Sequence, residues 1–381
     1  MTTVRTENPA MTSLHGAALP FMPPRPLRNA SVQTVLARWQ PAGMDAFMAT
    51  EQPVLLDAGP DATGVEPNHP VRLLGYVNRT AAPENRGLVL MLHGWEGCSH
   101  SVHNTVVTSA LLQAGYDVFR LNLRDHGPGI HVDPHALNKG IFVGTLLDEV
   151  ATATHQIAAM AGERPFYIVG ASMGGNFALR LAIRHSRTPF HNLARVVAVS
   201  PAINPSRSTR ALDAKLPYRR YFRERWLASL HHKEDLFPDL YDFSAMDPHL
   251  SVYDLTDRLV RMFGLFPDAE AYFTAYGVRG AAFEDLRVPT HIITAANDAV
   301  IPVVDFYALK PHPLLDLEIH PTGGHVGFVD GLPLRHRLPA MVLERLARPA
   351  GTIRPEFGPK FDPAFRPKLG AANGNGFQPL D

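Results

Sequence analysis

The sequence predicts an α/β fold in which helices flank a mostly parallel central sheet. Apolar runs of strand length alternate with segments of helical pattern up to residue 200, and the alternation resumes at residue 290. The run at residues 88–92 is continuously apolar, as strands covered on both faces require. In addition, the glycine-rich segment GASMGG at residues 170–175 joins one such run to a segment rich in alanine and leucine, which is typical of a sharp strand-to-helix turn.

The expected strands follow one another in a regular order along the chain. Two of them, with turn residues between, are expected to form an antiparallel pair at residues 53–57 and 71–77. Buried strands are expected at residues 88–92, 117–123, 166–169, 194–200, 290–294 and 315–320. Because helical segments separate most of these strands, we expect them to lie parallel in one sheet.

The expected helices lie at residues 27–39, 102–114, 145–161, 176–183 and 338–346. In the first, Val32, Leu36 and Trp39 recur at helical spacing, and we expect this helix to dock on the body of the protein. Ser31 is its expected N-cap. The third helix is expected to begin with a capping box formed by residues 145 and 148.

Three regions depart from this alternation of strands and helices. Residues 1–20 are polar and are expected to form a disordered arm, whereas residues 349–381 are rich in proline and glycine and are expected to be extended or disordered. Between about residues 202 and 288 the chain carries charged and aromatic helical segments and no strand pattern. An insertion there, between two strands of a domain of residues 21–348, has the position of a lid over a cleft.

Composition excludes several classes of function. The chain has 381 residues, of which 36 are basic and 36 acidic, so no overall positive field would attract nucleic acid. The single cysteine, Cys98, permits no intramolecular disulfide and argues against a cysteine-based metal site. We expect no metal and no organic cofactor. With no apolar run of about 18 residues, we expect no transmembrane segment and a cytoplasmic location, while peripheral membrane contact and oligomeric state stay open.

Ser172 stands at the centre of the glycine-rich segment, in a G-x-S-x-G pattern between an apolar run and a helix. A serine on such a turn sits above the edge of the sheet, and the amide groups of the helix start point at any negative charge that develops beside it. The alternative is a strand-to-helix turn without chemistry. The interpretation as a nucleophile therefore depends on whether the chain supplies a base and an acid.

A histidine and an aspartate follow late strands, in the order that a serine nucleophile of this kind requires. Asp298 comes directly after the expected strand at 290–294, and His325 lies in a glycine-rich loop after the strand at 315–320. Because parallel strands end at one edge of a sheet, we expect both residues near Ser172. Asp298 could instead cap a short helix. Asp305 and Asp330 are the competing acids.

Two backbone amides are expected to form the oxyanion hole: that of Met173, directly after Ser172, and that of Trp95, in the loop HGWEG after the strand at 88–92. Other polar residues near this edge are given structural roles. We expect Glu96 to support the loop, Cys98 to pack, the segment RDHG at 124–127 to brace the nucleophile, and Asp148 and Glu149 to cap or brace their helix.

These motifs resemble the α/β-hydrolase superfamily and, more narrowly, its YheT-like branch, which is related to the plant embryogenesis-associated Emb proteins. The segment LRNASVQT at 27–34 resembles the branch signature R-N-x-x-x-Q-T, and LHGWEGCSHS at 92–101 is similar to its H-G-x-E-G-S segment. LNKGIF at 137–142, YRRY at 218–221, DAEAYF at 268–273 and GGHVGF at 323–328 also match. The resemblance runs from about residue 21 to residue 348.

The resemblance implies an α/β-hydrolase fold and a serine esterase that uses Ser172, Asp298 and His325 as a catalytic triad, through an acyl-enzyme intermediate. The implied substrate is a small-molecule carboxylic ester with an acyl or lipid-like chain. Asn297–Asp298 stands where the branch often has two adjacent carboxylates. Two other functions stay open at this point: an acyltransferase with the same triad, and a binding protein that keeps the fold without catalysis.

Overall fold

The computed structural model of the chain describes residues 20–127 and 138–348. The expected arm at residues 1–20, apart from its last residue, and the expected tail at residues 349–381 lie outside the described residues. Within the described ranges, no helix combines the length and the apolar character needed to cross a bilayer.

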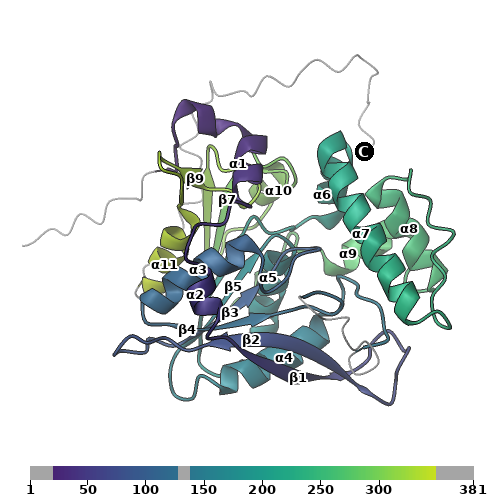
Figure 1. The fold of residues 1–381 in the computed structure, drawn as a ribbon, viewed down its shortest axis with the longest axis horizontal. Coiled ribbons are helices and arrows are strands. Elements are labelled where there is room, and N and C mark those ends of the chain that lie inside the picture. The colour runs from purple at the N-terminus through teal and green to yellow at the C-terminus, as the bar shows by residue number, and fades with distance from the viewer. Residues whose placement is uncertain (1–19, 128–137, 349–381) are drawn as a thin grey trace, which may run out of the picture.

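Eight strands form one sheet in the order β1-β2-β4-β3-β5-β6-β7-β8 (Figure 1). β2 pairs antiparallel with β1 and β4, and the remaining neighbours are parallel, which confirms the predicted fold class. The strands are β1 (Gln52–Pro60), β2 (Pro70–Asn78), β3 (Leu88–Leu92), β4 (Asp117–Leu121), β5 (Phe166–Ala171), β6 (Leu193–Val199), β7 (Thr290–Ala295) and β8 (Leu315–His320). A short hairpin of β9 (Val329–Asp330) and β10 (Arg335–His336), which the sequence did not indicate, lies outside this sheet.

Helices cover both faces of the sheet. α4 (Leu147–Ala159) and α5 (Met173–His185) pack on one face, and α3 (Val102–Gln113) and α11 (Leu338–Ala347) pack on the other. The sheet therefore lies between two apolar cores, in the three-layer arrangement that parallel strands require.

The alternation of side chains along β3 shows how one strand serves both cores. Leu88, Leu90 and Leu92 belong to the core under α4 and α5, whereas Val89 and Met91 belong to the core under α3 and α11. Successive side chains of a strand point to opposite faces, so a strand that is covered on both faces is apolar at most positions, and β3 is apolar throughout. This is why the continuous apolar run predicted the strand with its observed bounds.

Four helices separate β6 from β7: α6 (Pro205–Asp213), α7 (Leu216–Leu236), α8 (Val252–Met262) and α9 (Ala269–Tyr276). They lie together beside the end of the sheet (Figure 1), and α7, α8 and α9 contribute to two small apolar cores that also include Ile141, Val143 and Leu146. The segment without strand pattern is thus a helical insertion between two strands.

The first helical segment differs from the expectation. It is split into the short helix η1 (Arg25–Arg28) and α1 (Ala30–Leu36), and Asn29, not Ser31, is the N-cap, because its side chain accepts hydrogen bonds from two amides of the first turn. Val32 and Trp39 are exposed, so the apolar spacing does not mark the buried face. The helix docks instead through Gln33, which is fully buried.

The predicted capping box of the third helix is also wrong. α4 begins after Leu146, which provides no side-chain cap, and the Leu147 amide donates to the carbonyl oxygen of Thr145. Asp148 is left to pair with Arg184 of the neighbouring α5. The capping pattern was present in the sequence, but the helix begins one residue later than that pattern requires.

Gln33 holds α1 to the body through three hydrogen bonds. Its amide nitrogen donates to the carbonyl oxygens of Leu27 (2.7 Å) and Val329 (2.8 Å), and its oxygen accepts from the Val329 amide (2.8 Å). Unsatisfied buried backbone groups cost about 1–3 kcal/mol each. We therefore expect Gln33→Ala to lower the free energy of unfolding by about 2–4 kcal/mol in urea denaturation.

The matched control is Gln113→Ala. Gln113 is exposed at the end of α3 and makes one weak contact, with Ser109 at 3.4 Å, so its replacement should change the free energy of unfolding by less than about 0.5 kcal/mol. Equal losses in the two variants would contradict the role given to Gln33.

Candidate active site

Ser172 lies at the sharp turn between β5 and α5, with φ 56° and ψ −118°. A non-glycine residue rarely adopts this conformation, and such strain persists only where the surroundings enforce it. Here the enforcement is close packing. A side-chain carbon on Gly170 would lie 2.1 Å from the Gly174 oxygen, and one on Gly174 would lie 2.3 Å from the Leu92 oxygen. Glycine at both positions lets α5 begin directly above the sheet.

The three residues expected to act together lie in one hydrogen-bonded row. His325 Nε2 lies 3.0 Å from Ser172 Oγ, and His325 Nδ1 lies 2.9 Å from Asp298 Oδ2. The Asp298 side chain is fully buried, whereas that of His325 is 11 % exposed. The arrangement can move a proton from the serine hydroxyl to the imidazole, with the carboxylate fixing the ring and its tautomer.

Asp298 contacts His325 as expected of the acid, but it caps no helix, because the short helix Val304–Tyr307 begins after Val303 without a side-chain cap. Its Oδ2 faces His325, while its Oδ1 accepts hydrogen bonds from the amides of Val300 (2.8 Å) and Ile301 (3.0 Å). The amide bonds hold the carboxylate in place. The competing acids have other partners: Asp305, in the short helix α10 (Val304–Tyr307), pairs with Arg207 at 2.7 Å, and Asp330 in β9 lies 3.6 Å from Arg337.

The loop that carries His325 is held by α1. The His325 amide donates to Thr34 Oγ1 (2.9 Å), and a side-chain carbon on Gly324 would lie 2.4 Å from the Ala30 oxygen. Asn297 adds a second connection, since its oxygen accepts from the Gly324 amide (3.0 Å) and its nitrogen donates to the Arg28 oxygen (3.0 Å). The N-terminal helix thus positions the histidine, a role that the sequence gave to none of its residues.

The two amides predicted for an oxyanion hole belong to segments that meet at Ser172. Met173 is the first residue of α5, where backbone N–H groups have no partner within the helix. Trp95 follows Gly94, at which an added side-chain carbon would lie 3.7 Å from Ser172 Oγ, so the two backbones nearly touch. The structure therefore brings both segments to the serine.

His93 fixes the direction of the Gly94–Trp95 peptide. Its Nδ1 donates to the Gly94 oxygen (2.7 Å), and its Nε2 accepts from the Leu123 amide (3.0 Å). Burial, and next the neighbouring His126, lower the pKa of His93 well below its usual value, so the ring is neutral as this pattern requires. Because a trans peptide is planar, holding the carbonyl oxygen sets the direction of the Trp95 N–H.

One face of α7 lies on the loop that contains Trp95. The Trp95 ring stacks on Phe222 at 5.5 Å between ring centres and meets Trp226 edge to face at 5.4 Å. Two further residues of α7 hold Glu96 by hydrogen bonds: Arg225 donates to its backbone oxygen (2.9 Å) and Ser229 to its carboxylate (2.7 Å). Residues of α7 spaced three and four apart therefore support this loop, which agrees with the structural role expected for Glu96.

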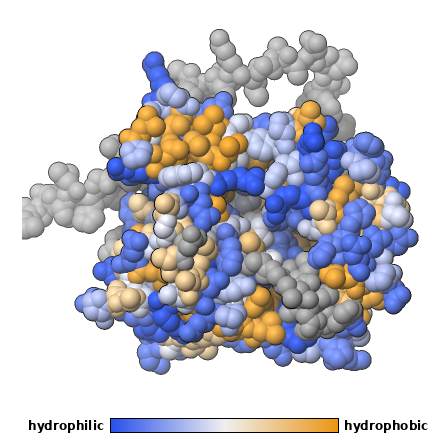
Figure 2. Space-filling view, viewed as in Figure 1, coloured by the Kyte–Doolittle hydropathy of each residue, from blue (hydrophilic) through white to orange (hydrophobic). Residues whose placement is uncertain are grey.

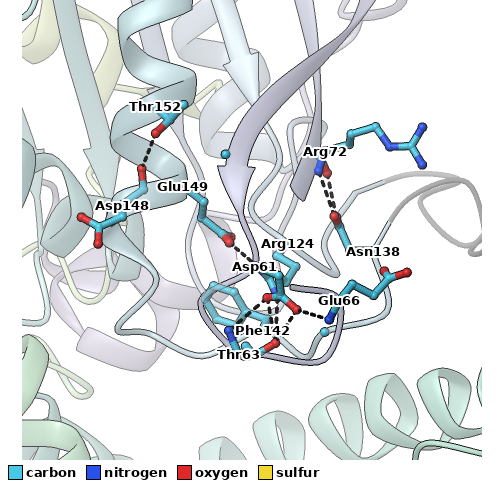
Figure 3. Close-up of polar contacts among 12 residues, drawn as sticks. Asp61, Thr63, Glu66, Arg72, Arg124, Asn138, Phe142, Asp148, Glu149 and Thr152 are labelled. Atoms are coloured by element: carbon cyan, nitrogen blue, oxygen red, sulfur yellow. Dashed lines mark hydrogen bonds and ion pairs between the residues drawn. The ribbon is translucent and has the colours of Figure 1, made fainter. Parts of the chain in front are cut away.

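A buried ion network braces the loop after β4, as expected for the segment at 124–127. The fully buried Arg124 lies between the carboxylates of Asp61 (2.7 Å) and Glu149 (2.5 Å), as Figure 3 shows. Burial alone would raise the pKa of Asp61, but Arg124 and the hydrogen bonds from Thr63 outweigh burial and hold the pKa at about 2. Burial raises the pKa of Glu149 to about 7, against the opposing effect of Arg124.

A second brace joins the same loop to the insertion. Lys233, near the end of α7, is buried and donates to Asp125 Oδ1 (2.8 Å) and to the backbone oxygens of Asn138 (2.9 Å) and Gly140 (3.2 Å). The Asp125 Oδ2 accepts from the Phe142 amide (2.9 Å). Neither charged group is left without an opposite charge, and the contacts tie the loop, the segment after residue 138 and α7 together.

Sequence reasoning missed several residues that the structure places around the cluster. Thr34, His93 and Ser229 each position a loop of the site, and the first two stood inside motifs that had been noticed without a role being given to them. His103 in α3 is a further neighbour. Its burial, and next the proximity of His325, lower its pKa to about 4, so that it is neutral at pH 7.

Groups that could ligate a metal, and the single cysteine, are expected to have no role in the site. In the described residues, no group of three or more histidine, cysteine or acidic side chains is arranged to hold a metal ion. Cys98 is a half-buried free thiol whose amide donates to Ser101 Oγ (2.9 Å). The packing role expected for its side chain stays a prediction.

Fold and site together define a class of protein: a doubly covered, mostly parallel sheet with a serine, a histidine and an aspartate in contact at the carboxyl edge. The chain belongs to the alpha/beta hydrolase family, whose family model matches residues 89–336.

Comparison with individual proteins shows more distant similarity. A predicted esterase of Synechocystis sp. is 24% identical over 246 residues, which are 57% of this chain and 63% of that protein, so the chain spans less than two thirds of this relative. An esterase of Pyrococcus furiosus is 17% identical, with a TM-score of 0.47 over 81% of this chain and 92% of its own. A peroxisomal alpha-beta-hydrolase of Saccharomyces cerevisiae is 14% identical, with a TM-score of 0.47 over 80% and 91%.

The raised pKa of Glu149 has a consequence for stability. In the unfolded chain this carboxyl ionises near its ordinary value of 4.5, whereas in the folded protein it ionises at about 7. Between these values the folded state binds the extra proton, so this group's contribution to stability falls as the pH rises through the window. We expect Glu149→Gln, which keeps an acceptor for Arg124, to remove that fall in thermal melts between pH 5 and pH 7.5.

The control is Glu284→Gln, which alters an exposed ion pair with Lys310. Its melting temperature should follow that of the unmodified protein at every pH, because exposed pairs contribute little. If the melting temperature of Glu149→Gln also followed that of the unmodified protein at every pH, the raised pKa of Glu149 would be refuted.

Proposed function

We propose that this protein is a serine hydrolase that cleaves carboxylic esters through an acyl-enzyme intermediate. The observation that carries the proposal is the row of contacts from Ser172 through His325 to Asp298 at 3.0 and 2.9 Å. Membership of the alpha/beta hydrolase family supports it. No metal or organic cofactor is part of the proposed chemistry.

In the first step, Ser172 Oγ attacks the ester carbonyl while His325 Nε2 takes its proton. Asp298 holds the proton on Nδ1 and stabilises the imidazolium that forms. The carbonyl oxygen gains negative charge, which the amides of Trp95 and Met173 stabilise. The tetrahedral intermediate collapses, His325 protonates the departing alcohol oxygen, and the acyl group stays on Ser172.

In the second step, water replaces the alcohol. His325 takes a proton from the water as it attacks the acyl carbon, and returns a proton to Ser172 Oγ when the acid departs. The neutral His93 and the contacts between α7 and Glu96 keep the Trp95 amide directed at the oxyanion through both steps. Preorganised donors of this kind need no rearrangement while the reaction proceeds.

The surroundings of Ser172 favour an ester with an apolar acyl or alkyl chain. Trp95, Met173, Phe222 and Trp226 are partly buried and pack against the main core beside the nucleophile, two of them on the loop and elbow and two on α7. We propose that the insertion acts as a lid whose α7 covers this apolar side of the site. A lipid-like chain would find more apolar surface there than a short polar one.

We further propose that the chain belongs to the YheT-like branch. The residues of its N-terminal signature have definite positions here: Gln33 fixes α1 to the body, and Thr34 holds the His325 loop. A signature far from the nucleophile in sequence is thereby placed beside the proposed base, which gives the motif a physical reason.

The proposal predicts the kinetics of two variants with p-nitrophenyl esters. Ser172→Ala removes the nucleophile and should lower kcat by about 10⁴-fold or more. Asp298→Asn keeps the shape of the acid but favours the wrong imidazole tautomer, and should lower kcat by about 10³- to 10⁴-fold. Both should keep the melting behaviour of the unmodified protein.

The control is Asp305→Asn, which changes the competing acid and should leave kcat within about threefold of the unmodified value, because Asp305 pairs with Arg207 and not with His325. Turnover by Ser172→Ala at the unmodified rate would refute the assignment of the nucleophile. A greater loss of kcat in Asp305→Asn than in Asp298→Asn would show that Asp305, and not Asp298, is the acid of the triad.

A further inference from the structure

Three segments that are distant in sequence form a closed ring beside the site: residues 25–38 with η1 and α1, residues 215–225 at the start of α7, and residues 297–307 with α10. A hydrogen bond joins each pair of segments. Asn297 donates to the Arg28 oxygen (3.0 Å), Lys215 donates to the Ala299 oxygen (3.2 Å), and Tyr218 donates to Ser31 Oγ (3.2 Å). We call these segments the rim of the site.

The rim adjoins the proposed triad on two sides. Asp298 lies within the third segment, and Thr34 of the first segment accepts the hydrogen bond of the His325 amide. On the remaining side, α7 continues from the rim to Phe222 and Trp226, whose rings contact Trp95. The rim is therefore continuous with the apolar side of the site.

Large apolar side chains stand out from all three segments of the rim. Val35 of α1 is 66 % exposed, Leu216 of α7 63 %, and Val304 and Tyr307 of α10 51 % and 50 %. Figure 2 shows orange residues gathered in the part of the molecule where Figure 1 places α1, with dark blue residues next to them. Single exposed apolar residues are ordinary, but a set of them on adjoining segments marks an interaction surface.

Basic residues outnumber acidic ones in the rim, although the whole chain is neutral. Residues 25–38 contain three arginines and no acid, and residues 215–225 contain five basic residues and one acid, Glu224, which pairs with Arg220. The third segment contributes Asp298 and Asp305, but both carboxylates are buried in the protein. The surface that surrounds the exposed apolar side chains is thus positive.

We propose that the rim docks this protein on a bilayer that contains anionic lipids. Apolar side chains of a docked surface enter the headgroup region, while arginine and lysine approach the lipid phosphates and carboxylates. The rim offers both features side by side, next to the proposed triad. Docking itself does not depend on the triad; the further point that an ester would enter from the bilayer rests on the proposed function.

The same charges argue against a second copy of the chain as the occupant of this surface. In a twofold dimer through the rim, the basic residues of one copy would face those of the other, and like charges brought together repel. An anionic bilayer reverses the sign of that interaction. It also accepts the exposed valines, leucine and tyrosine, which water does not favour.

The test is co-sedimentation of the full-length protein with vesicles. Vesicles of phosphatidylcholine alone are compared with vesicles in which a fraction of the lipid is phosphatidylserine. We expect binding to the anionic vesicles, weaker binding to the neutral ones, and loss of the difference at about 1 M salt, where charges are screened within about 3 Å. The double variant Val35→Glu with Leu216→Glu should bind the anionic vesicles at least tenfold more weakly.

The matched control is Leu55→Glu. Leu55 is 48 % exposed on β1, at the end of the molecule opposite α1 (Figure 1), and its replacement should leave vesicle binding unchanged.

A second variant, Arg25→Glu, tests the charge separately, because Arg25 is exposed and the variant should fold normally. It should weaken binding to anionic vesicles and leave binding to neutral vesicles unaltered.

Several results would overturn the proposal: no binding to anionic vesicles, equal binding by the rim variants and the Leu55 control, or a change in the oligomeric state of the rim variants in solution, which would assign the surface to a second copy. Ser172→Ala separates docking from catalysis. Vesicle binding by this variant at the unmodified level supports docking whatever its esterase activity, whereas lost binding would show that the rim alone does not carry it.

Discussion

The close approach of α5 to β3 is the constraint on which the rest of the site depends. Gly170 and Gly174 allow this approach because no side-chain carbon fits between the helix start and the strand ends, and Ser172 is held with positive φ as a result. The same packing brings the loop after β3 against the serine. A larger residue at either glycine would move nucleophile and loop apart together, so fold and proposed chemistry share one geometric cause.

Helices outside the central sheet position the loops that surround this turn. α1 holds the His325 loop through Thr34, and α7 supports the loop of Trp95 and the segment after β4 through Glu96 and Asp125. The buried charges of Arg124 and Lys233 are each compensated by carboxylates of neighbouring segments. Segments that look peripheral in the sequence therefore decide how the residues at the sheet edge face one another.

The fold and the members of the candidate site could be predicted from sequence where the signal is local. The run at residues 88–92 is apolar at every position because both faces of β3 are covered, and Ser172, Asp298 and His325 each follow a strand of one parallel sheet. The wrong predictions concern contacts and helix ends that the local sequence pattern does not determine. Gln33 is buried because Val329, nearly three hundred residues away in sequence, completes its hydrogen bonds. Thr145 does not cap α4 because the helix begins after Leu146.

The proposed chemistry depends on Ser172 as an activated nucleophile, and active-site labelling measures this most directly. The protein is treated with a fluorophosphonate probe, and the adduct is located by mass spectrometry of its peptides. We expect one adduct per chain, on Ser172, and none on the Ser172→Ala variant. The absence of any adduct, or an adduct on another residue such as Cys98, would contradict the proposed chemistry.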